Sequence, residues 1–307
     1  MKISTTLYFE RATQQMGNIQ GNLSKVQEQM STGLQIVKPS DSPDKAALVT
    51  RIESELARQT SYQDTLKAVN VRLTAQETAL TNTSDVLGRI KELATQAAND
   101  TLSTADRQSV ALELSSLREQ IMSLGNTQDS NGNYLFSGSK AGVAPYSKDA
   151  KGVVTYQGDQ ARMQVNVGDS RRMNLNMPGS DAFVRLVRDD GKGGKTGVDF
   201  FQALDDLVTA VKSSDHTNIQ RGLSEVDGMQ QGVSDGLAKV GTDLSVVDMQ
   251  NSVLDQVVLR LKSTRSDVED LDYTEAVTRM NKDQLALQAA QSSFSKISQL
   301  SLFNFIK

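Results

Sequence analysis

Apolar residues recur at alternating steps of three and four near both ends of the 307-residue chain. This spacing places the side chains on one face of an α-helix, and a sustained run of it forms the seam of a coiled coil. The terminal seams are Phe9, Ala12, Met16, Ile19, Leu23, Val26 and Met30 at the beginning, and Met280, Leu287, Ala290, Phe294 and Ile297 at the end. We expect these two helices to pair with each other and to leave apolar surface for neighbouring molecules.

The last helix carries almost no charge outside its seam. From Gln284 to Ile306 the only charged side chain is Lys296, and the other faces consist mostly of glutamine, serine and alanine. A helix of a soluble monomer normally places charges opposite its apolar face. The pattern therefore predicts a helix that is buried on more than one side. For an isolated amphipathic helix, packing inside one globular domain is the simpler interpretation, but two seams at opposite ends of one chain favour the paired arrangement.

Two joints interrupt the helical pattern. Gly33 can end the first helix, and Pro39 and Pro43 prevent a helix from running straight through. Asp41 is placed to cap the next helix, with Pro43 early in its first turn. A second joint lies around Asp267–Tyr273, where four acids interrupt the apolar pattern. We expect the two joints to lie side by side, at the border between the outer helix pair and an inner bundle.

Between the joints, the helical period predicts four inner segments. They span residues 44–99, 103–125, 198–212 and 223–261. Ser103 with Asp106 fits a capping box at the start of the second segment. The three glycines Gly228, Gly232 and Gly236 each cost about 1 kcal/mol relative to alanine inside a helix. They mark either a weak start of the last inner helix or a face of close backbone approach.

The period changes to two in the middle of the chain, from Gly152 onward. Such alternation is typical of short antiparallel strands, and two Gly-Asp pairs separate the runs. The alternating apolar residues are Val153, Met163, Val165, Val167, Met173, Leu175 and Met177. Residues 183–187 are a candidate further strand, and we expect residues 191–197 to form a loop.

This order of segments predicts a mainly α fold with a β insert. Both chain ends together make a long helical bundle or coiled coil, which carries a small antiparallel β domain. We expect a terminal coiled-coil assembly region at 1–44 and 265–307, a helical bundle domain at 45–140 and 198–264, and an inserted β domain at 141–197.

Composition narrows the range of functions. The net charge of -4 comes with no basic block, so the sequence does not indicate nucleic-acid binding. The absence of cysteine excludes disulfides, thiol catalysis and cysteine-ligated metals. No apolar run approaches membrane-spanning length, and the opening residues lack the pattern of a cleaved signal peptide. We expect no cofactor, no bound metal and no membrane insertion.

One short motif resembles the end of a phosphate-binding loop. Gly194-Lys195-Thr196 precedes a predicted helix, and residues 183–187 could supply the preceding strand. Asp189, however, stands where the first glycine of such a loop belongs, and no parallel βαβ series surrounds the motif. A flexible loop that joins the β insert to the bundle is the favoured interpretation.

Two further patterns contain the residue types of a catalytic or metal site but lack the required spacing. His216 lies beside Ser213 and Asp215, but near-consecutive residues at a helix end cannot supply the geometry of a catalytic triad. The acidic run at 267–272 lacks the glycine and the terminal glutamate of an EF-hand loop, so a solvated, capping-rich joint explains it better than a calcium site. We therefore expect the protein not to be an enzyme.

Several motifs, in the order in which they occur, resemble the flagellin superfamily. The segment Gln29–Ile36 resembles the amino-terminal hallmark of that family, and Ser266–Tyr273 resembles its carboxy-terminal hallmark. Within the superfamily, three features resemble the members of the hook–filament junction more than the filament subunits. They are Pro39–Pro43 in place of an alanine- and acid-rich stretch, the segment Asn131–Gly138, and the terminal Leu300–Phe303.

The resemblance covers roughly residues 1–140 and 200–307 and implies a structural role. It implies export through the flagellar export apparatus, binding of an export chaperone to the C-terminal helix, and an extracellular location on the bacterial flagellum. There the protein would form a ring-like layer of copies of itself between hook-associated protein 1 and flagellin. The nearer alternative is filament flagellin, which polymerises alone. A nucleotide-binding or hydrolytic protein with a helical stalk is the remote alternative.

Overall fold

The computed structural model describes residues 2–99, 102–150, 152–189 and 194–303. It divides into two compact units, which we describe separately. The inner unit is Thr60–Asp255, and the terminal unit combines Met1–Gln59 with Gln256–Lys307.

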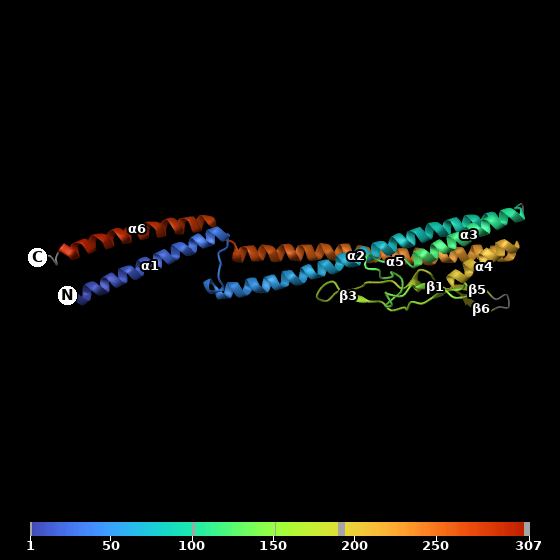
Figure 1. The fold of residues 1–307 in the computed structure, drawn as a ribbon, viewed down its shortest axis with the longest axis horizontal. Helices are drawn as coiled ribbons and strands as arrows, with labels where there is room; N and C mark the ends of the chain where they lie inside the picture. The colour runs from blue at the N-terminus through green and yellow to red at the C-terminus, as the bar shows by residue number, and fades with distance from the viewer. Residues whose placement is uncertain (1, 100–101, 151, 190–193, 304–307) are drawn as a thin grey trace. The chain divides into compact units, whose positions relative to one another are not determined.

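Helices dominate the described residues (Figure 1). Their bounds are Lys2–Thr32 for α1, Pro43–Ala97 for α2, Thr104–Gly125 for α3, Phe200–Ser213 for α4, His216–Glu269 for α5 and Tyr273–Phe303 for α6. A short 3-10 helix, η1, spans Pro39–Asp41, and a second, η2, spans Gly179–Asp181. At the start of α3, the hydroxyl of Ser103 accepts a hydrogen bond from Asp106 N at 3.2 Å, as the capping pattern predicts. The expected fold class, mainly α with a β insert, is confirmed.

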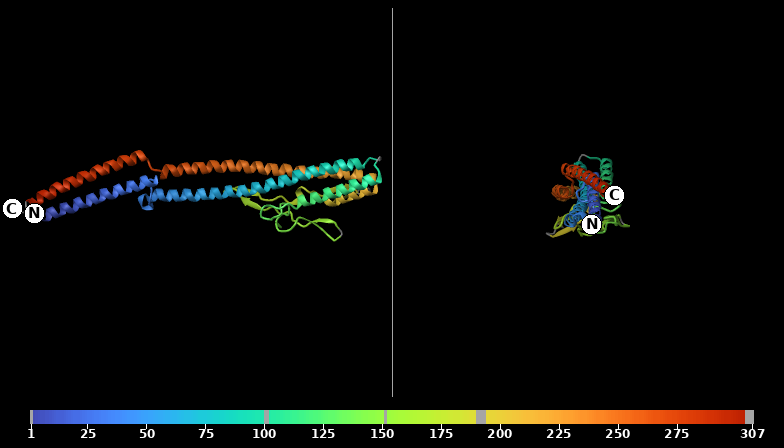
Figure 2. Two further views of the ribbon diagram at one scale, coloured as in Figure 1. Left: turned by 45° about the horizontal axis from the view of Figure 1, so that its top comes forward. Right: turned by 90° about the vertical axis from the view of Figure 1, so that its left-hand side faces the viewer.

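The insert consists of three two-stranded antiparallel hairpins. Strand β1 (Tyr146–Lys148) pairs with β2 (Val154–Tyr156), β3 (Gln164–Asn166) with β4 (Arg172–Asn174), and β5 (Leu186–Asp189) with β6 (Lys195–Val198). The hairpins lie together on one flank of the inner unit's helices, as both views show (Figures 1 and 2). The period of two thus correctly predicts antiparallel strands.

One local expectation in the insert is wrong. Gly197 lies in β6 opposite Val187, so the residues that end the expected loop belong to a strand. Residues 190–193 lie outside the described part of the chain. The same hairpin rules out the phosphate-loop geometry, because Lys195 and Thr196 sit on a strand of an antiparallel pair instead of on a strand-to-helix turn.

The core of the inner unit is formed by the seams of its helices and by the inner face of the hairpins. Leu66, Leu80 and Leu87 of α2 are fully buried, as are Phe136, in the segment before the insert, and Met229 of α5. None of the described helices is long and apolar enough to cross a membrane.

The glycines of α5 allow the insert to approach the helix closely. A Cβ atom at Gly232 would lie 2.6 Å from Val184 Cγ2 and 3.1 Å from the carbonyl oxygen of Ala182. At Gly236 the same atom would meet the Ala182 Cβ at 3.1 Å. Since real Cβ atoms do not tolerate the first of these contacts, close backbone approach explains the glycines better than a weak helix start does.

Ion pairs with little exposed surface attach the insert, and the segment 126–140 before it, to the helices. Arg72 of α2 lies 2.8 Å from Asp129 and also donates to the carbonyl of Tyr134 at 2.9 Å. Arg188 of β5 lies 2.7 Å from Glu225 on α5. Burial opposes the charge of Asp129, but the N–H groups of the following turn and the Arg72 guanidinium lower its pKa below the ordinary value. Breaking such a pair is costly because it leaves one charge buried alone.

Candidate assembly interface

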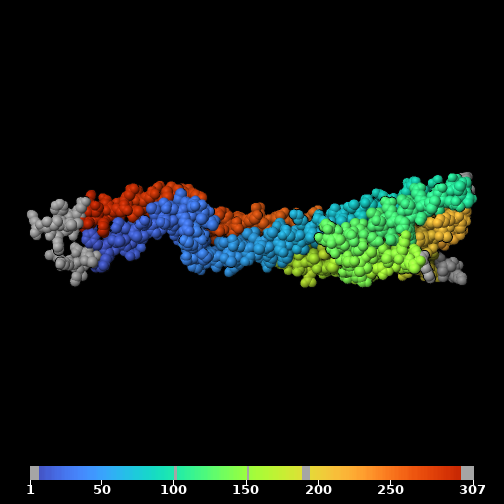
Figure 3. Space-filling view, viewed as in Figure 1, coloured from blue at the N-terminus to red at the C-terminus, as the bar shows by residue number. Residues whose placement is uncertain are grey.

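The terminal unit is built around an antiparallel pair of helices, α1 and α6. Near the free ends the rings of Phe9 and Phe294 meet edge to face with centroids 5.3 Å apart. At the other end the pair closes against the joint. The visible face of the pair in the space-filling view shows α1 and α6 in contact with each other, with no third segment covering them (Figure 3).

The structure places the predicted seam residues between the two helices. Val26 is buried, with 5% of its surface exposed, and the other described seam residues are half-buried apart from Ile297, which is 37% exposed. The half-buried set is Phe9, Ala12, Met16, Ile19, Leu23, Met30, Met280, Leu287, Ala290 and Phe294. Two helices enclose a shared seam only from two sides, which explains why burial stays incomplete.

One expectation about these residues needs correction. A seam that only neighbouring molecules complete predicts mostly exposed Leu287 and Phe294 in the isolated chain, yet both side chains are half-buried. The reason is α1, which covers one side of the seam even without a neighbouring molecule.

A small cluster of buried apolar residues lies between α1 and α6 next to the joint. It consists of Val26, Leu271 and Ala276, with Met30 and Met280 packed against it. Leu271 and the fully buried Ala276 are missing from the sequence-based seam because the acidic residues around them mask the apolar pattern. The sequence pattern that could have located Ala276 is its step of four to Met280, which extends the seam one turn toward the joint.

Backbone hydrogen bonds connect the two joints. Gln35 N donates to the carbonyl of Glu269 at 2.7 Å, and Leu271 N donates to the carbonyl of Gly33 at 2.9 Å. Gly33 has φ of 74°, and a Cβ atom there would lie 3.3 Å from the Tyr273 hydroxyl. A side chain at this position would therefore strain the backbone and crowd the tyrosine. The two joints lie side by side, as the nested order of helices predicts.

The proline joint is held by Asp41, though not in the expected way. Helix α2 begins at Pro43, and the preceding carbonyl, that of Ser42, accepts from Ala46 N at 2.9 Å. Asp41 instead accepts from Lys38 N at 3.0 Å and pairs with Lys25 of α1 at 2.8 Å. Asp41 therefore bonds within the 3-10 turn and to α1, and it is not the cap of α2. The Lys25 ammonium, followed by the Lys38 N–H, lowers the pKa of Asp41 below its ordinary value.

The acidic joint caps the last helix. Asp272 accepts from Thr274 N at 2.8 Å and from Glu275 N at 3.1 Å, which satisfies donors at the start of α6. Within the described residues no group of three or more His, Asp or Glu side chains is arranged to hold a metal ion.

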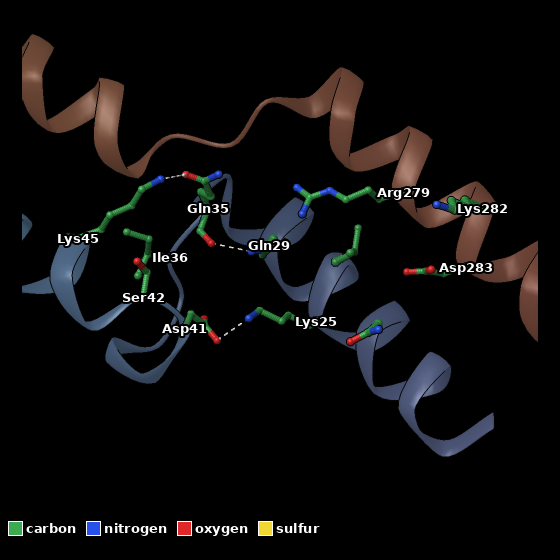
Figure 4. A pocket seen from close by; sticks show the side chains of 12 residues that line it. Lys25, Gln29, Gln35, Ile36, Asp41, Ser42, Lys45, Arg279, Lys282 and Asp283 are labelled. Atoms are coloured by element: carbon green, nitrogen blue, oxygen red, sulfur yellow. Dashed lines mark hydrogen bonds and ion pairs between the residues drawn. The ribbon is translucent and has the colours of Figure 1, made fainter. Parts of the chain in front are cut away.

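A groove of about 520 Å³ lies beside the joint, between α1, the start of α2 and α6 (Figure 4). We call it the basic groove, because four cationic side chains line it against two carboxylates. The cations are Lys25, Lys45, Arg279 and Lys282, and the carboxylates are Asp41 and Asp283. The groove did not follow from the sequence, since two of its cations come from helices near the start of the chain and the other two come from the distant α6.

Asp283 occupies a seam position that sequence reasoning missed. It continues the steps from Met280 to Leu287 and is half-buried. No hydrogen bond or ion pair to its carboxylate occurs within the part of the chain that the structure describes. A charge in the seam favours one alignment of the helices over others, since shifting the register would bury it elsewhere.

The outer faces of the pair are poor in charge. From Gln284 to Ser298 the exposed side chains of α6 are Gln, Ser, Ala, Leu285 and Ile297 apart from Lys296, and Leu285 is 67% exposed. Helix α1 likewise has no charged residue from Ala12 to Ser24, and Gly17 and Gly21 have open space beside them. These faces carry little of the charge that normally covers a helix in contact with water.

Comparisons with known proteins identify the family. The model of the bacterial flagellin N-terminal helical region matches residues 3–141, and that of the bacterial flagellin C-terminal helical region matches residues 223–306. The flagellar hook-associated protein 3 of Escherichia coli (strain K12) is 28% identical over 317 residues, which cover 100% of both chains. The flagellin of Clostridium tyrobutyricum is 30% identical, but over 49% of this chain and 40% of the flagellin.

A solved structure shares the fold. The crystal structure of Xanthomonas campestris FlgL aligns with a TM-score of 0.62 and 24% sequence identity, covering 71% of this chain and 99% of that one. The two family models together match more than two thirds of the chain, and a relative that aligns over the full length is a hook-associated protein. The chain therefore belongs to the flagellin superfamily, in its hook-associated protein 3 branch.

Proposed function

We propose that the chain is a structural, non-enzymatic protein of the bacterial flagellum that joins the hook to the filament. It forms a ring-like layer of several copies, with hook-associated protein 1 on the hook side and flagellin on the filament side. The observation that carries this proposal is the α1–α6 pair, whose seam stays half-buried and whose outer faces carry almost no charge. A helix pair of this kind gains further burial only from neighbouring molecules.

The filament subunit itself is the competing function within the same superfamily. Over nearly the whole chain, the identity is 28% to a hook-associated protein and 21% to a flagellin, that of Listeria monocytogenes, and this difference favours the junction role. The basis for this choice is the whole chain, including the insert, since the terminal helices alone would fit both roles.

Assembly requires that the chain reach the outside of the cell. We propose that it passes through the flagellar export apparatus without a cleaved signal peptide, and that a cytoplasmic export chaperone first binds α6. Helix α6 offers such a chaperone a long surface with an apolar seam and few charges. A chaperone on α6 would also keep α1 and α6 from pairing before export.

Labelling of intact flagella tests the proposed location. Antibodies against the hairpin insert should mark one band at the base of the filament, next to the hook. Labelling along the whole filament would assign the chain to the filament subunits instead. Purified chain that grows into long filaments without other proteins would lead to the same conclusion.

The proline joint provides a test of whether the protein strengthens the connection between hook and filament. Proline fixes φ and removes a backbone donor, so the segment from Pro39 to Pro43 holds a defined turn. We expect Pro39→Ala with Pro43→Ala to leave folding and secretion intact but to weaken the hook–filament connection. The measurement is the number of filaments that cells shed under shear. A double variant that keeps its filaments as well as the wild type would show that the joint has no mechanical role.

A further inference from the structure

The basic groove has more positive charge than its own residues neutralise. Lys25 is paired with Asp41 at 2.8 Å, whereas Lys45 donates to the neutral amide oxygen of Gln35 at 3.0 Å (Figure 4). Lys282 has neither an ion pair nor a hydrogen bond among the residues that the structure describes. Lys45, Lys282 and Arg279 therefore face one unpaired carboxylate of the groove, that of Asp283.

Arg279 adds an unsatisfied donor to this groove. Its Nε is buried and has no hydrogen-bond acceptor within the described residues. Its ion pair with Glu275 is long, at 3.6 Å, and both side chains are partly exposed. A buried N–H without an acceptor is unfavourable, so an incoming carboxylate would be stabilised here.

The most acidic segment of the chain lies in the same unit. We call it the acidic turn, residues 267–275, which holds five carboxylates and no lysine or arginine. Asp267, Asp270, Asp272 and Glu275 are exposed. Asp272 caps α6, and Glu269 has a long ion pair of 3.5 Å with Arg265, so most of this negative charge remains uncompensated.

We propose that the basic groove of one copy of the chain binds the acidic turn of the neighbouring copy. Within one chain, Glu275 of the turn forms the long ion pair with Arg279, but no ion pair joins Asp267, Asp270 or Asp272 to a groove cation among the described residues, so these three carboxylates remain available. Groove and turn are different surfaces of one molecule, and such a head-to-tail contact generates a ring when its rotation closes. Opposite charges on the two surfaces give the contact both its attraction and its direction. The inference rests on the proposed function, in which copies lie side by side in one layer.

Cysteine cross-linking in assembled flagella tests the contact directly, because the chain has no cysteine of its own. Two single-cysteine variants, Asp267→Cys and Lys282→Cys, are produced together in the same cells, so any disulfide between the two sites joins different copies. The matched control replaces Lys282→Cys by Gln288→Cys, which is exposed on the same helix outside the groove. Isolated flagella are treated with a mild oxidant and analysed without reducing agent.

We expect disulfide-linked dimers for the groove pair and few or none for the control pair. Flagella that contain both groove variants but no dimers, or equal dimers in the control, would overturn the proposal while leaving the junction role intact. Failure of the junction role shows separately, as absence of the wild-type chain from the base of the filament.

A charge exchange provides the second measurement. We expect Lys282→Glu to lower the amount of chain retained in sheared flagella about 1.4- to fivefold, the range for one exposed ion pair. Adding Asp267→Lys to the same chain should restore it. Equal losses in the single and double variants would contradict the proposal, and circular dichroism of each variant checks that folding is unchanged.

Discussion

The inner and terminal units have the same kind of helical seam but bury it to different extents. In the inner unit, Leu66, Leu80 and Leu87 of α2 lose all their exposure to water because other helices and the hairpins cover them. In the terminal unit, the seam between α1 and α6 is buried only in a short region around Val26 and Ala276, and the rest of that seam is half-exposed. The number of neighbouring elements, and not the apolar pattern, decides how much water a seam excludes.

This difference assigns separate tasks to the two units. The inner unit has its own core, whereas in our proposal the seam of the terminal unit is completed by other molecules. A residue of the same type should therefore contribute differently to stability in each unit. The predictions below use this expectation, and they begin with the largest effect.

Matched leucine-to-alanine changes should separate the units most clearly. Leu80→Ala removes a fully buried side chain and should lower the free energy of unfolding by about 2–5 kcal/mol. Leu23→Ala, on the half-buried seam of α1, should cost about 1 kcal/mol or less, because water already reaches that side chain. Chemical denaturation of the purified chain measures both. Equal losses would show that α1 and α6 have a core as closed as that of the inner unit.

Mild proteolysis should act first on the terminal unit. Helix pairs without further neighbours open more easily than packed cores, so cleavage should leave a fragment of roughly residues 45–265. Mass spectrometry of the products over time locates the cuts. A chain that resists cleavage at both ends, or that is cut first between the hairpins, would reverse the proposed ranking of the units.

Phe294→Ala should affect assembly more than stability. The ring contact with Phe9 is worth about 0.5–1.5 kcal/mol, and its loss should not change the melting of the inner unit. In cells the variant should be secreted but missing from the filament base, where burial by neighbours would have been larger. Calorimetry and flagellar labelling are the two measurements. A drop of several degrees in the main melting transition would mean that the α1–α6 pair unfolds together with the core.

Acid should weaken the proline joint only slightly. The pKa of Asp41 is lower in the folded chain than in the unfolded chain, mainly through its hydrogen bond to Lys25. Its contribution to stability is therefore fully present above the unfolded value, about pH 4, and is lost as the pH falls through the lower, folded value. Hydrogen exchange of peptides from residues 34–44 should rise as the pH falls below about 4, after correction for the intrinsic rate. In Asp41→Asn this extra rise should disappear, and an unchanged rise would assign the acid sensitivity to other groups.

The sequence predicts those features that depend on local periodicity. Steps of three and four located the helices, and the period of two located the insert and its antiparallel strands. The side-by-side joints followed from the nested order of the elements. These features depend on the residues within one segment or on the order of segments, and both are visible along the chain.

Features that depend on the position of a second segment were missed or wrong. Asp41 suits a helix cap by its position, but Lys25 from another helix gives it a different role. The half-burial of Phe294 depends on α1, and the strand at Gly197 depends on its partner β5. The basic groove is the extreme case, since Lys25, Lys45 and Lys282 share no local pattern and meet only in the folded chain.

The hydrogen bonds between the joints also bear on the order in which the chain folds. The hydroxyl of Tyr273 bonds to the carbonyl of Met30, 243 residues away along the chain. Closing a loop of that length from an unstructured chain costs about 5 kcal/mol in entropy, plus a constant. Once the inner unit has formed, Gln63 is bonded to Asp255, and most of that loop is already closed. The terminal helices should therefore fold last and only after the C-terminal end is available, so that a truncated chain cannot acquire a complete assembly surface.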